Sequence, residues 1–512
     1  MKVLSSHSRW AWLDDTFFGS MIRFPDAGLM RVLGARLRSL KPTSVELKVV
    51  SGTFQLIYRD QRAGSSLPNL KLNEFHLNWS PIGFIIEVIG ANARKGVSHM
   101  NDNPLNILHT IGLKALYPVI RCQLKLAGQL DVSRLIQAVN LTAKVVPELF
   151  CRYELADNSW QPVVTDASTL VQEVPADAPL DDTPDWFTQP QLRVQVQATS
   201  SGTTLTLTIS HILTDGSGFK QYLYLLSDCY NRGPVAITGV KNVVELSWLK
   251  ELLASHPAPQ TGNVDHPAQP LQLPKLAAAS TEQQRPQVSG LRLSQQLTRD
   301  LLAATHEQGV TVNDVLLATF GKTIQAYNQG NTTLAIACPT DMRQAIKNNH
   351  DLRIANHTAR YNPVVTSASD EPIGTAVQKM HTEMTQLKQR DQFLDSVRSL
   401  MAQYQTLGIH ELQQIVEANY HVREIGYTNF GVIDDQRLVF DQLPVTQCLL
   451  TGSFRTAPMF QVACSTFKGE LSLGFNMIGT DEEVQFGRVV TTAMVAQIKA
   501  FVAQSTTDAV VL

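Results

Sequence analysis

The chain has 512 residues, of which 44% are apolar and 17% are charged. This composition is typical of a globular protein that buries at least two sizeable cores, and it excludes a disordered chain. The net charge of −2 provides no overall attraction to nucleic acid or to an anionic membrane. Six scattered cysteines without a CxxC pair favour neither a disulfide framework nor a zinc site, and no apolar stretch has the length of about 20 residues that spans a bilayer. We therefore expect a cytoplasmic protein.

The first 99 residues differ in charge from the rest of the chain. They contain 13 Lys and Arg against 7 Asp and Glu, a net +6, whereas residues 100–512 contain 30 against 38, a net −8. Codons for the Arg-Lys-Gly-Val sequence at 94–97 can spell a purine-rich ribosome-binding site upstream of Met100, so we interpret residues 1–99 as a translated leader. The alternative is a genuine basic N-terminal domain that uses residues 29–38 as an amphipathic helix for an interface or a partner.

Residues 100–254 are predicted to form an N-terminal lobe of mixed strands and helices. The periodicity predicts strands over 118–126, 192–198 and 204–210, and helices over 132–146 and 219–230. Thr alternates with Leu or Ile from 204 to 209, as in a strand whose two faces meet different environments, so His211 is expected at a strand end. The Asp-Gly-Ser-Gly cluster at 215–218 then ends the extended run before the helix.

His211 and Asp215 are the leading candidates for catalysis. A neutral imidazole at a strand end can take a proton from a hydroxyl or an amine, and its ordinary pKa of about 6.5 keeps it mostly neutral near pH 7. Asp215 can pair with the ring, bind a metal, or hold the turn through an arginine, and the spacing does not separate these roles. The sequence contains no GxGxxG, Walker or GxSxG motif, so hydride transfer, nucleotide hydrolysis and serine hydrolysis lack a basis.

Residues 255–286 contain six prolines among Gln, Ala, Ser and Thr, a composition that predicts an extended linker without a core. Residues 287–512 are then predicted to form a C-terminal lobe. The expected helices are 297–307, 312–327, 373–390, 394–404 and 482–504, and the expected strands lie near 334, 424–429, 459–467 and 470–476. Thr311 or Asn313 is expected to cap the helix that begins at 312.

Five segments, in the same order, resemble one family of enzymes. SHILTDGSGF at 210–219 resembles the HHxxxDG signature of the condensation-domain and chloramphenicol-acetyltransferase-like acyltransferase superfamily. The others are residues 120–153, GVTVNDVLLA at 309–318, CPTDMR at 338–343 and YTNFG at 427–431. The match covers roughly residue 106 to the C-terminus, and the resemblance is greatest to small bacterial stand-alone condensation-like proteins labelled alcohol acetyltransferase. Ser210 departs from the pattern, because it stands where the family often has a first histidine.

The resemblance implies an α/β (α+β) fold of two chloramphenicol-acetyltransferase-like lobes, with mixed sheets and a tunnel at their interface. It also implies that His211 is the catalytic base and that Asp215 is structural and holds its loop through an arginine, for which Arg343 is our candidate. Backbone N–H groups at Gly216 and its neighbours are candidates for stabilising an oxyanion. Candidates for the tunnel lining are Ser210, Thr428 and Asn429.

The implied reaction moves an acyl group from a thioester, with acyl-CoA as co-substrate, to an alcohol or amine acceptor, without a tightly bound cofactor or a metal. Two alternatives remain open. One is condensation with a carrier protein that acts in trans. The other is a catalytically silent binding or scaffold protein, which the replacement of the first motif histidine by Ser210 supports. His357 and His421 lie in loop-like sequence and are expected to be structural, while His381 and Glu383 lack zinc-site spacing. A monomer is expected, since two lobes complete the site within one chain.

Overall fold

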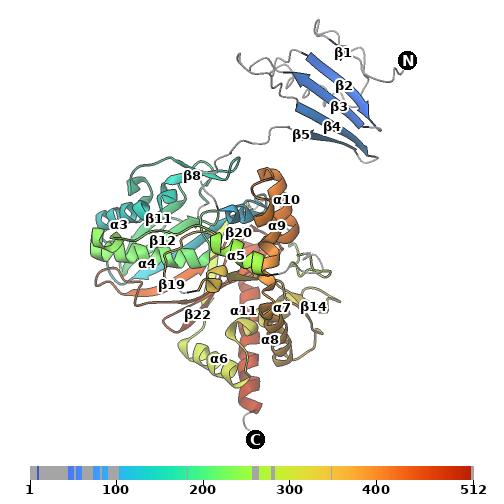
Figure 1. The fold of residues 1–512 in the computed structure, drawn as a ribbon. Helices are drawn as coiled ribbons and strands as arrows, with labels where there is room; N and C mark the ends of the chain where they lie inside the picture. The colour runs from blue at the N-terminus through green and yellow to red at the C-terminus, as the bar shows by residue number, and fades with distance from the viewer. Residues whose placement is uncertain are drawn as a thin grey trace. The chain divides into compact units, whose positions relative to one another are not determined.

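The computed structural model describes five strands within residues 1–98, together with residues 103–181, 183–256, 265–277, 283–347 and 349–508. The chain divides into two compact units, Met1–Ser98 and His99–Leu512. The strands of the first unit form one antiparallel sheet: β1 (Arg9–Trp10), β2 (Ser44–Val50), β3 (Thr53–Arg59), β4 (Asn73–Ser80) and β5 (Gly83–Ile89), paired in chain order (Figure 1). The helix predicted at 29–38 lies outside the described residues.

The N-terminal lobe of the second unit is a five-stranded sheet with helices on its apolar face. The strands run in the order β10 (Val171–Val174), β11 (Leu192–Thr199), β12 (Gly202–Ser210), β7 (Val119–Leu126) and β19 (Val445–Thr451). Only β10 and β11 are parallel neighbours. Leu124, Leu205 and Leu207 share a buried core with side chains of α3 (Val132–Val145) and α4 (Gly216–Arg232), which lie along the sheet in Figure 1.

The two faces of β12 do meet different environments, and both are buried. All nine residues of the strand are buried. Its Leu and Ile side chains enter the apolar core, whereas Thr208 lies opposite Arg121 of β7. Arg121 forms an ion pair with Asp181 at 3.2 Å, and Asp181 accepts a hydrogen bond from the backbone N–H of Val288 at 3.2 Å. The ion pair with Asp181 thus gives Arg121 a partner on the polar face of the sheet, whereas Arg121 Nε and Nη1 and Thr206 Oγ1 have no hydrogen-bond partner among the described residues.

The C-terminal lobe is built on a second mixed sheet in the order β18 (Ile425–Ile433), β21 (Phe460–Phe467), β22 (Glu470–Gly479), β20 (Phe454–Thr456) and β6 (Leu116–Tyr117), with β13 (Arg285–Arg292) paired to β22. Three two-stranded sheets pair β8 (Cys151–Glu154) with β9 (Ser159–Pro162), β14 (Thr333–Ala335) with β17 (Val364–Thr366), and β15 (Cys338–Asp341) with β16 (Thr358–Tyr361). The helices are α5 (Ser247–Ser255), α6 (Gln295–Glu307), α7 (Val312–Gln325), α8 (Ile373–Gln389), α9 (Asp395–Gln403), α10 (Ile409–Asn419) and α11 (Asp481–Asp508).

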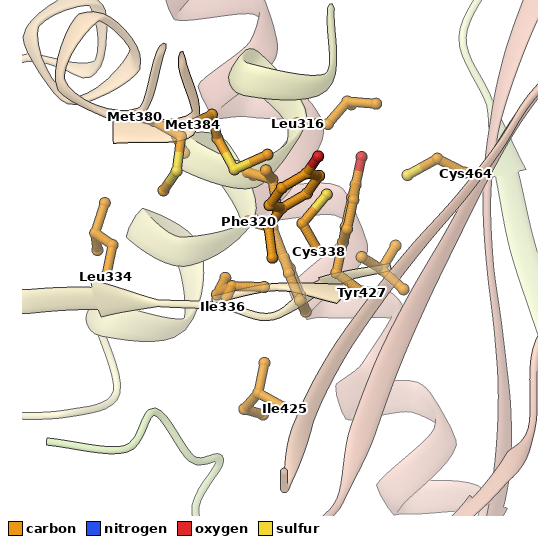
Figure 2. Packing of buried hydrophobic residues seen from close by; sticks show 14 of the residues in the cluster. Leu316, Phe320, Leu334, Ile336, Cys338, Met380, Met384, Ile425, Tyr427 and Cys464 are labelled. Atoms are coloured by element: carbon orange, nitrogen blue, oxygen red, sulfur yellow. The ribbon is translucent and has the colours of Figure 1, made fainter. Parts of the chain in front are cut away.

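Helix α7 lies at the centre of the C-terminal core. Figure 2 shows Leu316 and Phe320 of this helix packed with Met380 and Met384 of α8 and with residues of the strands beside them. Thr311 is the residue that caps α7: its side chain accepts from the N–H of Asp314, whose carboxylate in turn accepts from the N–H of Thr311. This reciprocal capping box satisfies N–H groups that the first helical turn leaves open.

The two lobes exchange segments. β19, which lies far into the C-terminal half of the sequence, pairs with β7 of the N-terminal sheet. In the other direction, Leu105, Ile107 and Leu108 pack into the C-terminal core, and β6 pairs with β20. A division of the chain at residue 254 therefore does not separate all the residues of one core from those of the other.

The predicted linker 255–286 overlaps the last residue of α5 and the first two residues of β13, and its longest described part, residues 265–277, packs against the C-terminal lobe. Residues 265–277 contain no helix or strand, but Leu271 and Leu273 belong to the core of that lobe and are 3% and 5% exposed. Asp265 is fully buried. The expectation that this composition contributes nothing to a core is wrong here, because two leucines between prolines supply enough apolar surface to bind the segment.

Helix α11 has the length and the apolar composition of a membrane-spanning helix, which departs from the expectation that no such stretch exists. Met494, Ile498 and Phe501 on this helix are fully buried in the C-terminal core. Buried residues make up 33% of its apolar window, so packing within the fold accounts for part of this composition. All six cysteines are free and buried.

Candidate active site

His211 is fixed immediately after β12. Its backbone N–H donates to the carbonyl oxygen of Pro118 at 3.1 Å, and its ring Nδ1 lies 2.9 Å from the carbonyl oxygen of Thr214. Because a carbonyl oxygen only accepts, Nδ1 carries the proton, and in the neutral ring Nε2 has the lone pair. Burial lowers the pKa of His211, although Asp215 and the hydrogen bonds to the ring oppose the shift. The ring is therefore a neutral base near pH 7.

The structure brings Asp215 and Arg343 together. Arg343 Nη1 donates to Asp215 Oδ2 at 2.9 Å, and both side chains are almost completely buried. The same carboxylate oxygen accepts the N–H of His357 at 2.7 Å, while Oδ1 accepts the N–H of Gly218 at 2.8 Å. The carboxylate thus joins the turn after β12 to two segments of the C-terminal lobe, and it makes no hydrogen bond to the His211 ring in this geometry.

All three nitrogen atoms of the Arg343 guanidinium donate hydrogen bonds, and together they hold the loop at residues 353–355. Nη1 also donates to Asp341 at 2.7 Å, Nε and Nη2 donate to the carbonyl of Arg353 at 3.1 and 2.8 Å, and Nη2 donates to that of Ala355 at 2.7 Å. A planar group with five donors is suited to such a junction, whereas a lysine is not.

The start of α4 leaves no room for side chains at its glycines. A Cβ on Gly216 would lie 2.6 Å from the Phe430 ring, and one on Gly218 would lie 2.2 Å from Thr214 Oγ1. The N–H of Gly218 is committed to Asp215, so this group does not serve an oxyanion. Gly216 lines the cavity beside His211 and remains the candidate donor at this helix start.

A cavity of about 130 Å³ opens at His211 between segments of both lobes. Among the sequence candidates, His211, Asp215, Gly216 and Thr428 line it. Ser210 does not: it is fully buried and its Oγ accepts the N–H of Ile212 at 3.2 Å. Asn429 is also outside the lining, because it is exposed and donates to Asn313 at 3.3 Å.

His109 is a residue of this cavity that the sequence did not point to. Its ring stacks on that of His211 with centroids 3.7 Å apart and planes 18° apart. Burial, and then the nearby His211, lowers its pKa well below the ordinary value, so both rings are neutral. His109 ends the short helix η1 (Pro104–His109), about a hundred residues before His211, and no local pattern marks it.

The other histidines considered from the sequence lie in different surroundings. His421 lines the cavity and pairs with Glu417 at 2.6 Å. His357 is fully buried beside Trp248, and burial together with Arg343 and Arg353 lowers its pKa to about 3. His381 lies 2.8 Å from Asp314, in an ion-pair geometry. No group of three or more potential metal ligands occurs in the described part of the chain.

Neither the models of protein families nor the curated proteins include a match to this chain. Solved structures match most of it. Polyketide synthase associated protein 5 from Mycobacterium tuberculosis has a TM-score of 0.54 at 16% identity, over 78% of this chain and 97% of that one. Trichothecene 15-O-acetyltransferase from Fusarium sporotrichioides has a TM-score of 0.54 at 11% identity, over 78% and 94%.

Condensation domains match as well. The first condensation domain of the calcium-dependent antibiotic synthetase has a TM-score of 0.53 at 15% identity, covering 79% of this chain and 95% of the domain. At these identities the likeness establishes the fold. The mixed α/β, two-lobed architecture expected from the five sequence segments is thereby confirmed.

Proposed function

We propose that this chain, which has the fold of condensation domains and chloramphenicol-acetyltransferase-like acyltransferases, transfers an acyl group from a thioester to an acceptor hydroxyl with His211 as the base. The observation that carries the proposal is the tautomer of His211. Its Nδ1 is held by the Thr214 carbonyl, so the lone pair of Nε2 is available at a cavity between the lobes. The likeness to an acetyltransferase and to condensation domains supports the same class of reaction.

The reaction needs one residue for both proton transfers. Nε2 of His211 takes the proton of the acceptor hydroxyl as its oxygen attacks the thioester carbonyl carbon. When the tetrahedral intermediate collapses, the C–S bond breaks and the imidazolium returns the proton to the departing thiolate. No covalent acyl-enzyme forms, and the ring ends in its starting tautomer.

Gly216 is the proposed oxyanion donor. It lines the cavity at the N-terminus of α4, where backbone N–H groups and the helix dipole favour negative charge. Phe430 packs against its Cα so closely that only glycine fits. The N–H is thus held at a fixed position by packing rather than by a mobile side chain.

The proposed donor is acyl-CoA and the proposed acceptor is a small alcohol. The test is release of free thiol from a series of acyl-CoA esters in the presence of short alcohols, measured for the whole chain and for His211→Ala. We expect the variant to lose about 10²–10⁴-fold in rate, the usual contribution of a general base. His306→Ala is the matched control, because His306 is exposed on α6.

Equal thiol release by the wild type and by His211→Ala would contradict the role of His211. If no acyl-CoA supports release, the same assay with an acyl group on a carrier protein tests the condensation alternative. Failure of both donors would leave the catalytically silent binding protein as the better description.

A further inference from the structure

Three arginines share the wall of the His211 cavity. Arg360, Arg423 and Arg455 all line it, and their side chains are only 6%, 9% and 7% exposed. Arg360 belongs to β16, Arg423 precedes β18, and Arg455 belongs to β20. The fold therefore gathers three buried guanidinium groups from separate segments beside the candidate base.

Among the described residues, one carboxylate forms ion pairs with this cluster. Asp265 pairs with Arg423 Nη2 at 2.7 Å and also with Arg360. Glu417, whose charge also acts on Arg360, pairs with His421, and the Asp215 carboxylate at the cavity pairs with Arg343. Three buried guanidinium groups and one buried carboxylate leave an excess of two positive charges, and Arg455 has no carboxylate partner among the described residues. Such charges are costly to bury unless they are paired.

The protein supplies neutral partners for part of the cluster. Arg360 Nη2 donates to the carbonyl of His421 at 2.8 Å and its guanidinium lies 4.0 Å from the centre of the Tyr420 ring. Arg423 donates to the Ala335 carbonyl at 3.2 Å and to Asn362 at 3.0 Å. These contacts orient the two groups without cancelling their charge.

Arg455 is the least compensated of the three. Its Nη1 donates to the carbonyl of Arg423 at 2.6 Å, while its buried Nε has no hydrogen-bond partner in the residues that the structure describes. A Cβ on Gly426 would lie 2.7 Å from Nη2, so the strand passes the guanidinium where it has no side chain. Burial lowers the pKa of Arg455 to about 10 and leaves it charged near pH 7. A guanidinium in this state is suited to an oxyanion ligand.

We infer that the cavity binds a substrate with an anionic oxygen group, a carboxylate or a phosphate ester, which Arg455 holds together with Arg360 and Arg423 while the reacting group lies at His211. That the ligand is a substrate rests on the proposed acyl transfer, whereas the anion site itself rests on the three arginines. The cavity is expected to select ligands by charge, because a neutral analogue does not compensate the excess positive charge of the guanidinium groups.

Binding without turnover tests the site directly. Calorimetry on the whole chain, with no acyl donor present, compares 4-(hydroxymethyl)benzoate and 4-(hydroxymethyl)phenyl phosphate with the neutral 4-(hydroxymethyl)benzamide. At least one anion is expected to bind about tenfold or more tightly than the amide, since a charged hydrogen-bonded pair contributes about 1.5–3 kcal/mol and each 1.4 kcal/mol is tenfold. Equal binding of all three, or no binding of either anion at millimolar concentration, would overturn the inference.

Variants assign the effect to the cluster. Arg455→Gln is expected to weaken binding of the anion about tenfold or more and binding of the amide by less, so that the preference for the anion is lost. The matched control is Arg232→Gln, whose side chain is 53% exposed in a surface pair with Asp228. Retention of the preference in a folded Arg455→Gln protein would count against the site, and if that variant does not fold, the comparison of the ligands on the wild type still decides.

Thiol release distinguishes the two sources of the anion. With acetyl-CoA, 4-(hydroxymethyl)benzoate is compared with benzyl alcohol as acceptor; with benzyl alcohol, succinyl-CoA is compared with butyryl-CoA as donor. A preference for the charged acceptor assigns the anion to the acceptor, and a preference for succinyl-CoA assigns it to the acyl group. Anion binding without any thiol release would contradict the proposed acyl transfer but not the anion site. Thiol release without a charge preference for acceptor or donor, together with equal binding of the charged and neutral ligands, would contradict the anion site but not the acyl transfer.

Discussion

Removing the Asp215 carboxylate is expected to loosen the loop that it holds in the C-terminal lobe. Asp215→Ala removes the acceptor of three hydrogen bonds, from Arg343, the N–H of His357 and the N–H of Gly218. Loss of one partner from a buried pair costs about 3–5 kcal/mol. Arg343 keeps Asp341 at 2.7 Å, so we expect about 3 kcal/mol, the lower end of that range.

Hydrogen exchange measured by mass spectrometry gives this energy locally. In a peptide covering residues 353–358, a loss of about 3 kcal/mol makes the opening that limits exchange about 100-fold more frequent, because each 1.4 kcal/mol is a factor of ten. Asp341→Ala is the matched control: this carboxylate binds the same guanidinium but is 23% exposed, so its loss is expected to have a smaller effect. Equal exchange in the two variants would refute the reasoning that the buried Asp215 pair holds the loop.

Three further predictions concern the cavity and the turn beside it. Burial lowers the pKa of His211, and the proposed base acts in its unprotonated form. The rate of thiol release should therefore stay constant until the pH falls below about 6.5, the ordinary pKa of histidine, and should decrease from there. A half-maximal rate above pH 7 would contradict this role of His211. His109→Phe keeps a ring against His211, so its kcat in steady-state kinetics should stay within a few-fold of the wild type, whereas that of His109→Ala should fall about tenfold. Equal kcat values for the two variants would mean that the stacking does not orient the base. Gly218→Ala places a Cβ 2.2 Å from Thr214 Oγ1 and should lower the free energy of unfolding in urea by about 1–3 kcal/mol. In the control Gly374→Ala, the new Cβ meets only the end of the Gln504 side chain, so the effect should be small. Similar losses of stability in the two variants would show that the turn relaxes freely.

The elements with strong periodicity were predictable from the sequence. Helices near α3, α7 and α8 and strands near β7, β12 and β21 appear where the apolar repeat predicted them. The pairing of Asp215 with Arg343, which lies more than 120 residues later in the sequence, could be predicted only because both segments resemble motifs of one family. Local patterns alone left the role of Asp215 open.

Other residues of the site carry no local signal. His109 lies in a short helix, and its approach to His211 depends on how residues 104–111 pack into the opposite lobe. Arg360, Arg423 and Arg455 are ordinary strand or loop residues in the sequence, and only tertiary pairing buries them together. Asp265 lies in a proline-rich segment whose composition predicted a solvated linker, so its burial was missed as well.

The exchange of β19 has a consequence for fragments and chimeras of this protein. A fragment that ends at residue 256 lacks β19 and leaves one edge of β7 unpaired, with free N–H and C=O groups along it. Edges of this kind recruit strands from other molecules. Recombination between relatives of this fold should therefore transfer residues 445–451 together with the N-terminal sheet, although their codons lie far beyond those of β12, which ends at Ser210.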